Sequence, residues 1–344
     1  MRMHRFVLAV AALLGAAWAG EAAAQTAPDQ LRTIRDRGVF RCGVYDSVPG
    51  LSALDAQGNR VGFDVDYCKA MAAAILGDAT KVEFRTMSLA QGIPALKSGE
   101  VDMVALAITY SIQRDTELGL DFVGPTLYSG HAFMVAKRTG ATKIADLDGA
   151  TICIVAGGIT DSLIADYFRA RNMTFKPVAI ENSTQMYTLY EEGRCDVVTS
   201  EVPFLGMRRS RLRDPSAHLI LPEIFAKSHM GPVVRDDDRA YVHVARWVHF
   251  ALVNAEEMGI TRENVAKMAA ESRDPAIRRF LGVEGEIGEK MGLSNDFTQK
   301  IIAAVGNYGE IYERHYGQQS VIKLPRGLNA LALEGGLQWS PTWR

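Results

Sequence analysis

The chain has 344 residues, of which 48% are hydrophobic, and its formal net charge is −2 at pH 7. Because this charge is nearly balanced, it gives no electrostatic reason to expect nucleic acid or an anionic membrane surface as a partner. The length predicts two lobes or domains rather than one, and the hydrophobic fraction is sufficient to fill two cores.

The first 24 residues have the pattern of a secretory signal peptide. Positive charge in "MRMHR" precedes an apolar run over residues 6–19, and "GEAAAQ" then offers an A-x-A cleavage site. A membrane anchor is the alternative, but a spanning helix needs about 20 apolar residues. We therefore expect an exported protein that is cleaved before Gln25, with no cysteine at that site to receive a lipid.

The four cysteines allow three disulfide pairings. In an exported protein an even number of cysteines favours disulfides, and the absence of a C-x-x-C spacing argues against metal or redox roles. The sequential pairing, Cys42–Cys68 and Cys153–Cys195, would place one bridge in each of two lobes, whereas the other two pairings would join the lobes. We favour the sequential pairing, in which each bridge would contribute ~3 kcal/mol.

Strands and helices alternate in the first part of the chain. The hydrophobic patterns predict strands over residues 39–45, 81–87 and 101–108, and helices over residues 64–76 and 89–99. This βαβαβ order is typical of a doubly wound α/β lobe, in which ligands bind beyond the carboxyl ends of the strands.

The same pattern recurs in the second part, where "LYEEGRCDVVTSEV" corresponds to "ALKSGEVDMVALAIT". Strands are expected over residues 150–157, 175–181 and 195–202, and helices over residues 160–172 and 183–193. Two similar lobes that share one cleft follow from this duplication. We expect crossover strands, and hence hinges, at residues 128–137 and 228–236, followed by a mostly helical stretch and an ordered tail.

An arginine follows the buried strand in "DMVALAITYSIQRD", residues 102–115. A guanidinium at the end of a buried strand must be paired, solvated or available for an anion. Arg114 therefore either forms a permanent ion pair with Asp115 or Asp121, or it holds the anionic group of a ligand.

Catalytic motifs are scarce in this sequence. It contains no G-x-S-x-G, H-E-x-x-H, Walker A or post-strand G-x-G-x-x-G motif, so we expect neither an enzyme nor a metal or cofactor. The segment "VAGGITDS" follows a strand and opens a helix, so its N–H groups could hold a carboxylate or another small anion.

Seven segments of the chain together form a recognisable pattern: "GFDVDYCKAMAAAI", "IPALKSGEVDMV", "ITYSIQRD", "LGLDFVGPTLYSG", "GRCDVVTSEV", "LPEI" and "GPVVR". They resemble the solute-binding proteins of polar amino-acid ABC transporters (family 3). The four cysteines and the tail "VGNYGEIYERHYG…LPRGLNALALEGGLQWSP" are similar to the subgroup of general L-amino-acid-binding periplasmic proteins. The resemblance covers nearly all of the chain after the signal peptide.

The resemblance implies a type II periplasmic-binding-protein fold, with two doubly wound α/β lobes joined by two crossover hinge strands. The divisions would be residues 1–24 as signal peptide, 25–131 with 232–344 as lobe 1 with a helical C-terminal extension, and 132–231 as lobe 2. The implied function is to capture a small amino acid or related carboxylate in the periplasm and to deliver it to an ABC permease. We expect a monomer.

The family pattern also assigns roles to individual residues. Arg114 would take the ligand's α-carboxylate, and Thr109 would meet its amino and carboxylate end. Glu201 would take the α-ammonium. The turn formed by Gly157, Gly158 and Ile159 in the second lobe would hold the carboxylate with its N–H groups. The cleft would also be lined by Asp46, Leu89 and Ala107. Tyr45 is either a ligand contact or an ordinary core or rim tyrosine.

The sequence departs from the family pattern inside the site itself. Gly158 and Ile159 replace a common Thr-Thr, Glu201 replaces a usual Asp, and Ala107 occupies a position that is often polar or glycine. Tyr67 stands where the family usually has an aliphatic residue or Phe, a change that we expect to concern packing only. The ligand is therefore either an amino acid held differently or another small carboxylate. Two rival functions are a periplasmic dehydratase-like enzyme, with Asp46 or Glu201 as its acid or base, and a ligand receptor for a membrane sensor.

Overall fold

The structure of the chain is a computed structural model that describes residues 29–155, 159–180 and 183–344. The expected signal peptide therefore lies outside the described residues. Within the described part of the chain, no helix is both long and apolar enough to cross a membrane.

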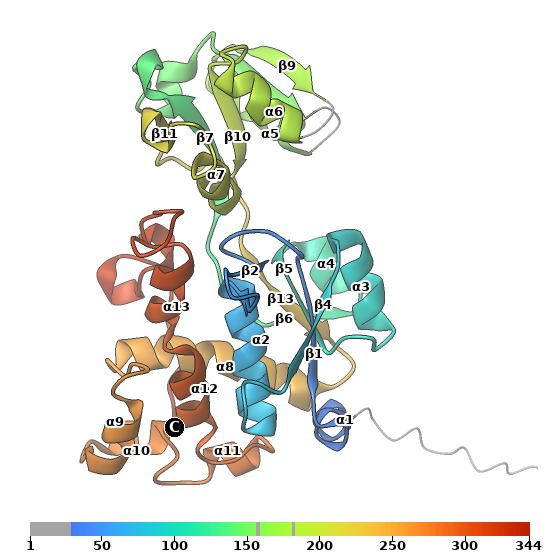
Figure 1. Cartoon of the computed structure of the whole chain (residues 1–344), viewed down its shortest axis with the longest axis vertical. Coiled ribbons are helices and arrows are strands. Elements are labelled where there is room, and N and C mark those ends of the chain that lie inside the picture. The colour runs from blue at the N-terminus through green and yellow to red at the C-terminus, as the bar shows by residue number, and fades with distance from the viewer. Residues whose placement is uncertain (1–28, 156–158, 181–182) are drawn as a thin grey trace, which may run out of the picture.

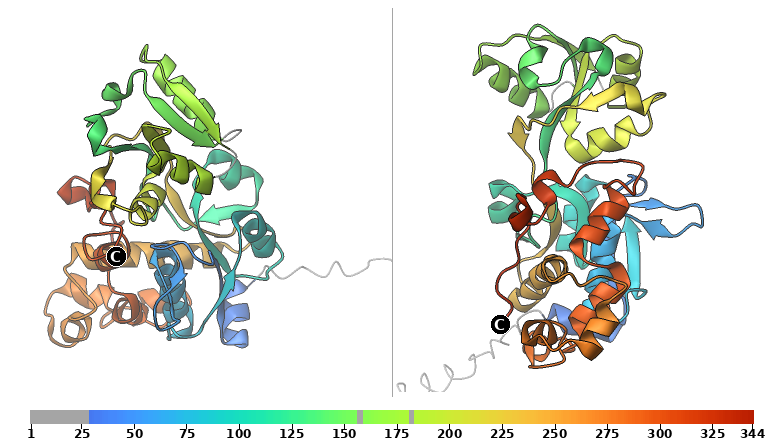
Figure 2. Two further views of the ribbon diagram at one scale, coloured as in Figure 1. Left: turned by 45° about the horizontal axis from the view of Figure 1, so that its top comes forward. Right: turned by 90° about the vertical axis from the view of Figure 1, so that its left-hand side faces the viewer.

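Two β-sheets build two lobes, which lie one above the other in Figure 1 and in the right-hand view of Figure 2. Lobe 1 has the strand order β4-β1-β5-β13-β6, and lobe 2 has the order β11-β7-β10-β8-β9 with β12 beside β7. The strands of lobe 1 are β1 Phe40–Val44, β4 Val82–Thr86, β5 Met103–Thr109, β6 Leu120–Phe122 and β13 Met230–Arg235, with a separate hairpin of β2 Ala53–Leu54 and β3 Arg60–Val61. The strands of lobe 2 are β7 Gly130–Ala136, β8 Thr151–Val155, β9 Lys176–Ile180, β10 Val197–Glu201, β11 His218–Ile220 and β12 Ala226–Lys227.

Helices cover both sheets (Figure 1). The helices of lobe 1 are α1 Gln30–Arg37, α2 Phe63–Leu76, α3 Leu89–Lys97, α4 Ile112–Glu117, α8 Arg239–Glu257, α9 Val265–Glu271, α10 Pro275–Phe280, α11 Ile287–Lys290, α12 Phe297–Val305 and α13 Tyr308–His315. The helices of lobe 2 are α5 Ile159–Arg169, α6 Ser183–Glu191 and α7 Val202–Arg209. Short 3-10 helices are Lys137–Thr139, Ile144–Leu147, Pro215–Ala217, Gly327–Asn329 and Ala332–Glu334.

Each sheet combines parallel strands with one antiparallel strand that comes from the far side of the lobe junction. In lobe 1, β1 pairs in parallel with β4 and β5, and β13 runs antiparallel to β5. In lobe 2, β8 pairs in parallel with β9 and β10, and β7 runs antiparallel to β10. The expectation of two α/β lobes is therefore confirmed.

Two short connections join the lobes. The first precedes β7, which starts the second sheet at Gly130, and the second lies between β12 and β13, which returns to the first sheet at Met230. The divisions expected from the sequence, at residues 131/132 and 231/232, remain a proposal.

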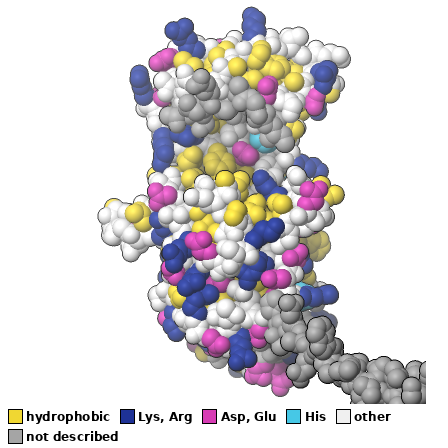
Figure 3. Space-filling model, turned by 90° about the vertical axis from the view of Figure 1, so that its right-hand side faces the viewer, with side chains coloured by type: hydrophobic (Ala, Val, Ile, Leu, Met, Phe, Trp, Pro, Cys, Tyr) yellow, Lys and Arg dark blue, Asp and Glu magenta, His cyan; other side chains and the backbone are white. Residues whose placement is uncertain are grey.

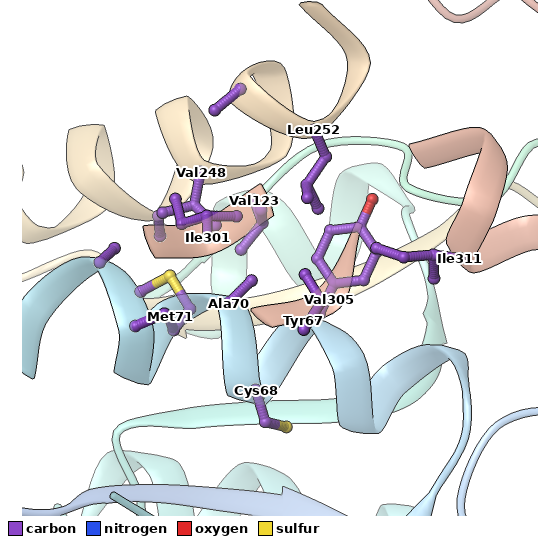
Figure 4. Packing of buried hydrophobic residues seen from close by; sticks show 14 of the residues in the cluster. Tyr67, Cys68, Ala70, Met71, Val123, Val248, Leu252, Ile301, Val305 and Ile311 are labelled. Carbon is purple, nitrogen blue, oxygen red and sulfur yellow. The ribbon is translucent and has the colours of Figure 1, made fainter. Parts of the chain in front are cut away.

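Helix α2 is the centre of the lobe 1 core. It is buried on nearly all sides because it lies between the sheet and a layer of helices, with α8 and α12 packed against it. Figure 4 shows Tyr67, Ala70 and Met71 directed toward that helical layer, while Cys68 points to the other side. An alanine-rich helix permits this close packing because small side chains let neighbouring elements approach.

The four cysteines pair in sequential order. Cys42 of β1 bonds Cys68 of α2 with a Cα–Cα distance of 6.0 Å, and Cys153 of β8 bonds Cys195 with a Cα–Cα distance of 5.5 Å. Each bridge lies inside one lobe, so neither of them crosses the junction between the lobes.

The C-terminal segment, residues 318–344, runs along lobe 1 and reaches the junction (Figures 1 and 2). Asn329 binds the backbone of Tyr128 twice, accepting from its N–H at 2.7 Å and donating to its carbonyl at 2.9 Å. Arg209 of α7 donates to the Ile322 carbonyl at 2.9 Å. The segment therefore contacts lobe 1, the first connection and lobe 2.

Candidate functional site

A cavity of about 450 Å³ lies between the lobes, beyond the carboxyl ends of β5 and β10. This is where ligands bind in doubly wound α/β lobes. Figure 3 shows hydrophobic side chains in the hollow between the lobes, with charged groups near it. The residues that line it are Tyr45, Leu89, Ala107, Thr109 and Arg114 from lobe 1, and Ile154, Thr160, Met186, Tyr187, Thr199, Ser200, Glu201, Phe204, Met207 and Arg208 from lobe 2.

Arg114 is held at the mouth of the cavity by local structure. It lies in the first turn of α4, whose N-cap is Ser111, and its Nη1 donates to the Thr109 carbonyl at 2.9 Å. Asp121, one of the two partners considered above, instead pairs with Arg246. Among the described residues, no carboxylate oxygen lies within 4.0 Å of the Arg114 guanidinium. Its remaining N–H groups are therefore available to an external anion.

The end of β5 also contacts the second connection between the lobes. The Thr109 hydroxyl lies 3.4 Å from the Ser228 hydroxyl, and the Tyr110 N–H donates to the His229 carbonyl at 2.8 Å. Thr109, which lines the cavity, is therefore in direct hydrogen-bond contact with the segment that links the two lobes.

Ala107 adopts an unusual backbone conformation at the cavity wall. Its φ of 46° lies in the left-handed region, which costs a non-glycine residue about 1–2 kcal/mol. Its N–H donates to the Asp64 carboxylate at 3.1 Å. Burial raises the pKa of Asp64 to about 7, while this hydrogen bond acts to lower that pKa.

Glu201 is the last residue of β10 and projects from lobe 2. Its side chain is 25% exposed, and its Oε1 lies 3.7 Å from Nε2 of His131. Its Oε2 accepts a hydrogen bond from the Ser200 hydroxyl at 3.2 Å. The carboxylate is thus oriented by two neighbours from lobe 2 and still borders the cavity.

Tyr45 shows that these groups share one electrostatic environment. Its pKa is raised to about 12, first by burial and then by the negative charges of Asp64 and Glu201, whereas Arg114 lowers it. Because Asp64 and Arg114 belong to lobe 1 and Glu201 to lobe 2, charges from both lobes act on the same phenol. Tyr45 lines the cavity and also packs against the lobe 1 core, so both interpretations of it, a ligand contact and a core or rim tyrosine, remain open.

Other residues implied by the resemblance lie elsewhere or outside the described part. The Asp46 side chain is 81% exposed and lies 3.6 Å from Arg60, and Asp46 does not appear among the described residues that line the cavity. Gly157 and Gly158 lie outside the described residues. Ile159 begins α5, and Thr160 directly after it lines the cavity.

Helix α7 adds side chains that the sequence did not suggest. Phe204, Met207 and Arg208 of this helix line the cavity. The sequence patterns predict no helix over residues 202–209. The available signal was Pro203, because proline is favoured in the first turn of a helix. Among the described residues, no group of three or more His, Cys, Asp or Glu side chains could hold a metal ion.

Residues 40–318 match the family model described as bacterial extracellular solute-binding proteins, family 3. The chain belongs to this family. The match fits its two α/β lobes, which have the type II periplasmic-binding-protein fold expected from the sequence.

Similar proteins cover almost the whole chain. The general L-amino acid-binding periplasmic protein AapJ of Rhizobium johnstonii is 42% identical over 337 residues, which are 97% of this chain and 98% of that protein. The glutamate/glutamine/aspartate/asparagine-binding protein BztA of Rhodobacter capsulatus is 44% identical over 96% of this chain and 97% of its own length. A periplasmic binding protein from Brucella ovis, solved with glutathione bound, is 44% identical with a TM-score of 0.83 and covers 92% of this chain and 100% of that chain.

Proposed function

We propose that the interlobe cavity captures an L-α-amino acid, or a related small carboxylate, and that the chain delivers it to an ABC permease. The observation that carries this proposal is the Arg114 guanidinium, which is fixed at the cavity mouth and has no carboxylate partner among the described residues. A guanidinium binds a carboxylate with two parallel hydrogen bonds, so it selects both charge and orientation.

The opposite lobe supplies the complementary charge. Glu201 offers a carboxylate to an α-ammonium, while the Thr109 hydroxyl lies near the Arg114 side. A zwitterion would therefore be bound by one cation and one anion from different lobes, which gives the ligand a reason to draw the lobes together. Exclusion of water on closure would strengthen both interactions.

The related proteins support this ligand class and widen it. Two relatives have names that state amino-acid binding, and one solved relative holds glutathione. Glutathione carries a free α-amino and α-carboxylate pair on its γ-glutamyl end, so it presents the same group as an amino acid. We include γ-glutamyl peptides among the candidate ligands of this chain.

The proposed setting is the periplasm. Removal of residues 1–24 would release a monomeric protein whose closed form docks on the permease. We propose that Arg114 and Glu201 bind rather than react with the ligand, because members of family 3 are described as solute-binding proteins. Turnover of a candidate cyclic carboxylate by the purified protein would favour the dehydratase-like alternative instead.

The test is calorimetric titration of the mature chain after unfolding and refolding with its disulfides intact, which removes copurified ligand. We expect at least one L-amino acid or γ-glutamyl peptide to bind with micromolar or tighter affinity, about −8 kcal/mol. Arg114→Ala should weaken that binding about 100-fold, since two charge-assisted hydrogen bonds would be lost at roughly 1.5 kcal/mol each.

Arg32→Ala serves as the matched control. Arg32 is an arginine of α1 with a side chain that is 76% exposed, and it pairs with Asp36 at the surface. This variant should bind the ligand as tightly as the wild type. Equal affinity of Arg114→Ala and wild type for the same ligand would refute the assignment of Arg114.

A further inference from the structure

A second arginine faces the same cavity from the other lobe. Arg208, in the last turn of α7, lines the cavity opposite the lobe 1 residues. Its guanidinium carbon lies 5.2 Å from the ring centroid of Tyr187, which is a cation–π distance. Among the described residues, no carboxylate oxygen lies within 4.0 Å of it. Like Arg114, it is therefore a cation without a carboxylate partner in the described part of the chain.

The charges of the cavity wall are therefore unequal. The described lining contains the cations Arg114 and Arg208 and a single carboxylate, that of Glu201. A neutral zwitterion would pair Arg114 and Glu201 and leave Arg208 uncompensated. Closure of the lobes would then place an unpaired guanidinium in a region of reduced water, which is unfavourable. A ligand with one additional negative charge would remove this imbalance.

The side chains next to Arg208 suit a ligand that is longer than its charged ends. Phe204 lies one helical turn before Arg208 on α7, so both side chains share one face of the helix. Phe204 and Met186 line the cavity with apolar surface. An aliphatic chain that connects two anionic ends could therefore lie along this wall.

We propose that Arg208 is the anion subsite for a second carboxylate, and that the ligand is an α-amino acid with a distal carboxylate. This inference rests on the proposed function, because Arg114 and Glu201 must hold the amino-acid end. Two sources share the chemistry. One is an acidic amino acid such as glutamate, and the other is a γ-glutamyl peptide such as glutathione, whose glycine carboxylate would lie farther away.

Arg208 differs from the neighbouring arginines because it lines the cavity, so it is not simply part of a general basic surface. Arg209 donates to the Ile322 carbonyl of the C-terminal segment, and Arg211 is exposed. Within the described residues that line the cavity, lobe 2 contributes Arg208 and neither of these two. Arg211→Gln therefore removes the same charge from the same lobe without altering the cavity wall.

The experiment compares matched ligands by calorimetric titration against the refolded mature chain. One pair is L-glutamate and L-glutamine, and the other is glutathione and its glycine monoethyl ester. In each pair the second member lacks the distal negative charge; L-glutamine keeps nearly the size of L-glutamate, whereas the ester also adds an ethyl group. We expect the wild type to bind the dicarboxylate of at least one pair about tenfold or more tightly than its neutral partner, and the pair with the larger ratio identifies the source.

Arg208→Gln should abolish that preference while changing the affinity for the neutral member less than about threefold, and Arg208→Lys should restore part of it. Arg211→Gln should behave as wild type, and thermal unfolding checks that each variant is folded.

An Arg208→Gln protein that keeps the full preference would overturn the subsite. Equal binding of both members of each pair by the wild type would also overturn it while leaving the proposed function intact. If the wild type binds no ligand that contains an α-amino acid, both proposals fail.

Discussion

Asp64 is an ionisable group for which the structure predicts a measurable stability penalty at neutral pH. It lies in the first turn of α2 and is buried, and the hydrogen bond from the Ala107 N–H does not offset its desolvation. Its pKa is therefore raised to about 7, compared with about 3.9 for an aspartate in an unfolded chain. Asp64→Asn keeps the shape of the side chain and an oxygen that can accept from Ala107, but it removes the titration.

The sign follows from proton binding. Between about pH 4 and pH 7 the folded chain keeps a proton on Asp64 that the unfolded chain has released, so the stability of the wild type falls as pH rises through this range. Above the folded pKa both states are ionised and the penalty stays constant. A difference of about three pKa units corresponds to roughly 4 kcal/mol as an upper value. The variant lacks this loss.

The measurement is urea unfolding of wild type and Asp64→Asn in steps from pH 4.5 to pH 8.5. We expect the stability of the variant relative to wild type to increase with pH by up to about 4 kcal/mol, and to level off above the folded pKa. Other titrating groups are common to both proteins and cancel in the difference. A stability difference that is independent of pH between Asp64→Asn and wild type would refute the reasoning.

Two further predictions concern backbone strain and the C-terminal segment. Ala107→Gly should leave the free energy of unfolding unchanged or raise it by up to ~1 kcal/mol, because glycine adopts the positive φ of this position freely. A loss of more than about 1 kcal/mol in urea unfolding would contradict this. Asn329→Ala should lower stability by about 2 kcal/mol, since it leaves the N–H and carbonyl of Tyr128 without their partner. Asn329→Asp keeps the acceptor for the Tyr128 N–H but places a carboxylate oxygen against the Tyr128 carbonyl at a buried position, so it should lose at least as much stability as Asn329→Ala. A smaller loss for Asn329→Asp would count against this account.

Local patterns in the sequence were sufficient for most of the fold. The strand expected over residues 39–45 appears as β1, and the helix expected over residues 64–76 appears as α2. Helix α7 was missed because the apolar pattern of β10 continues into Val202 without an obvious break. The helix begins there because Pro203, in its first turn, fits a helix start and cannot donate to a sheet.

The site was harder to predict because it depends on contacts between distant parts of the chain. The helix expected over residues 64–76 has Asp64 and Asp66 in its first turn, where a carboxylate is favoured, but the sequence pattern did not indicate that they are buried. Asp66 is bound by Arg314 at 2.6 Å and His315 at 2.7 Å, from a helix almost 250 residues away. Arg208 could not be recognised either, since its place in the cavity depends on how lobe 2 faces lobe 1.

The central place of β13 in the first sheet has a consequence for the order in which the lobes can form. β13 lies between β5 and β6, yet it follows the whole of lobe 2 along the chain. A ribosome or an export channel releases the chain from its N-terminus, so all of the strands of lobe 2 emerge before β13 does. Lobe 2 can therefore become a finished unit, with its disulfide, while lobe 1 still lacks a strand between β5 and β6. The lobe that begins the protein is the one that is completed last.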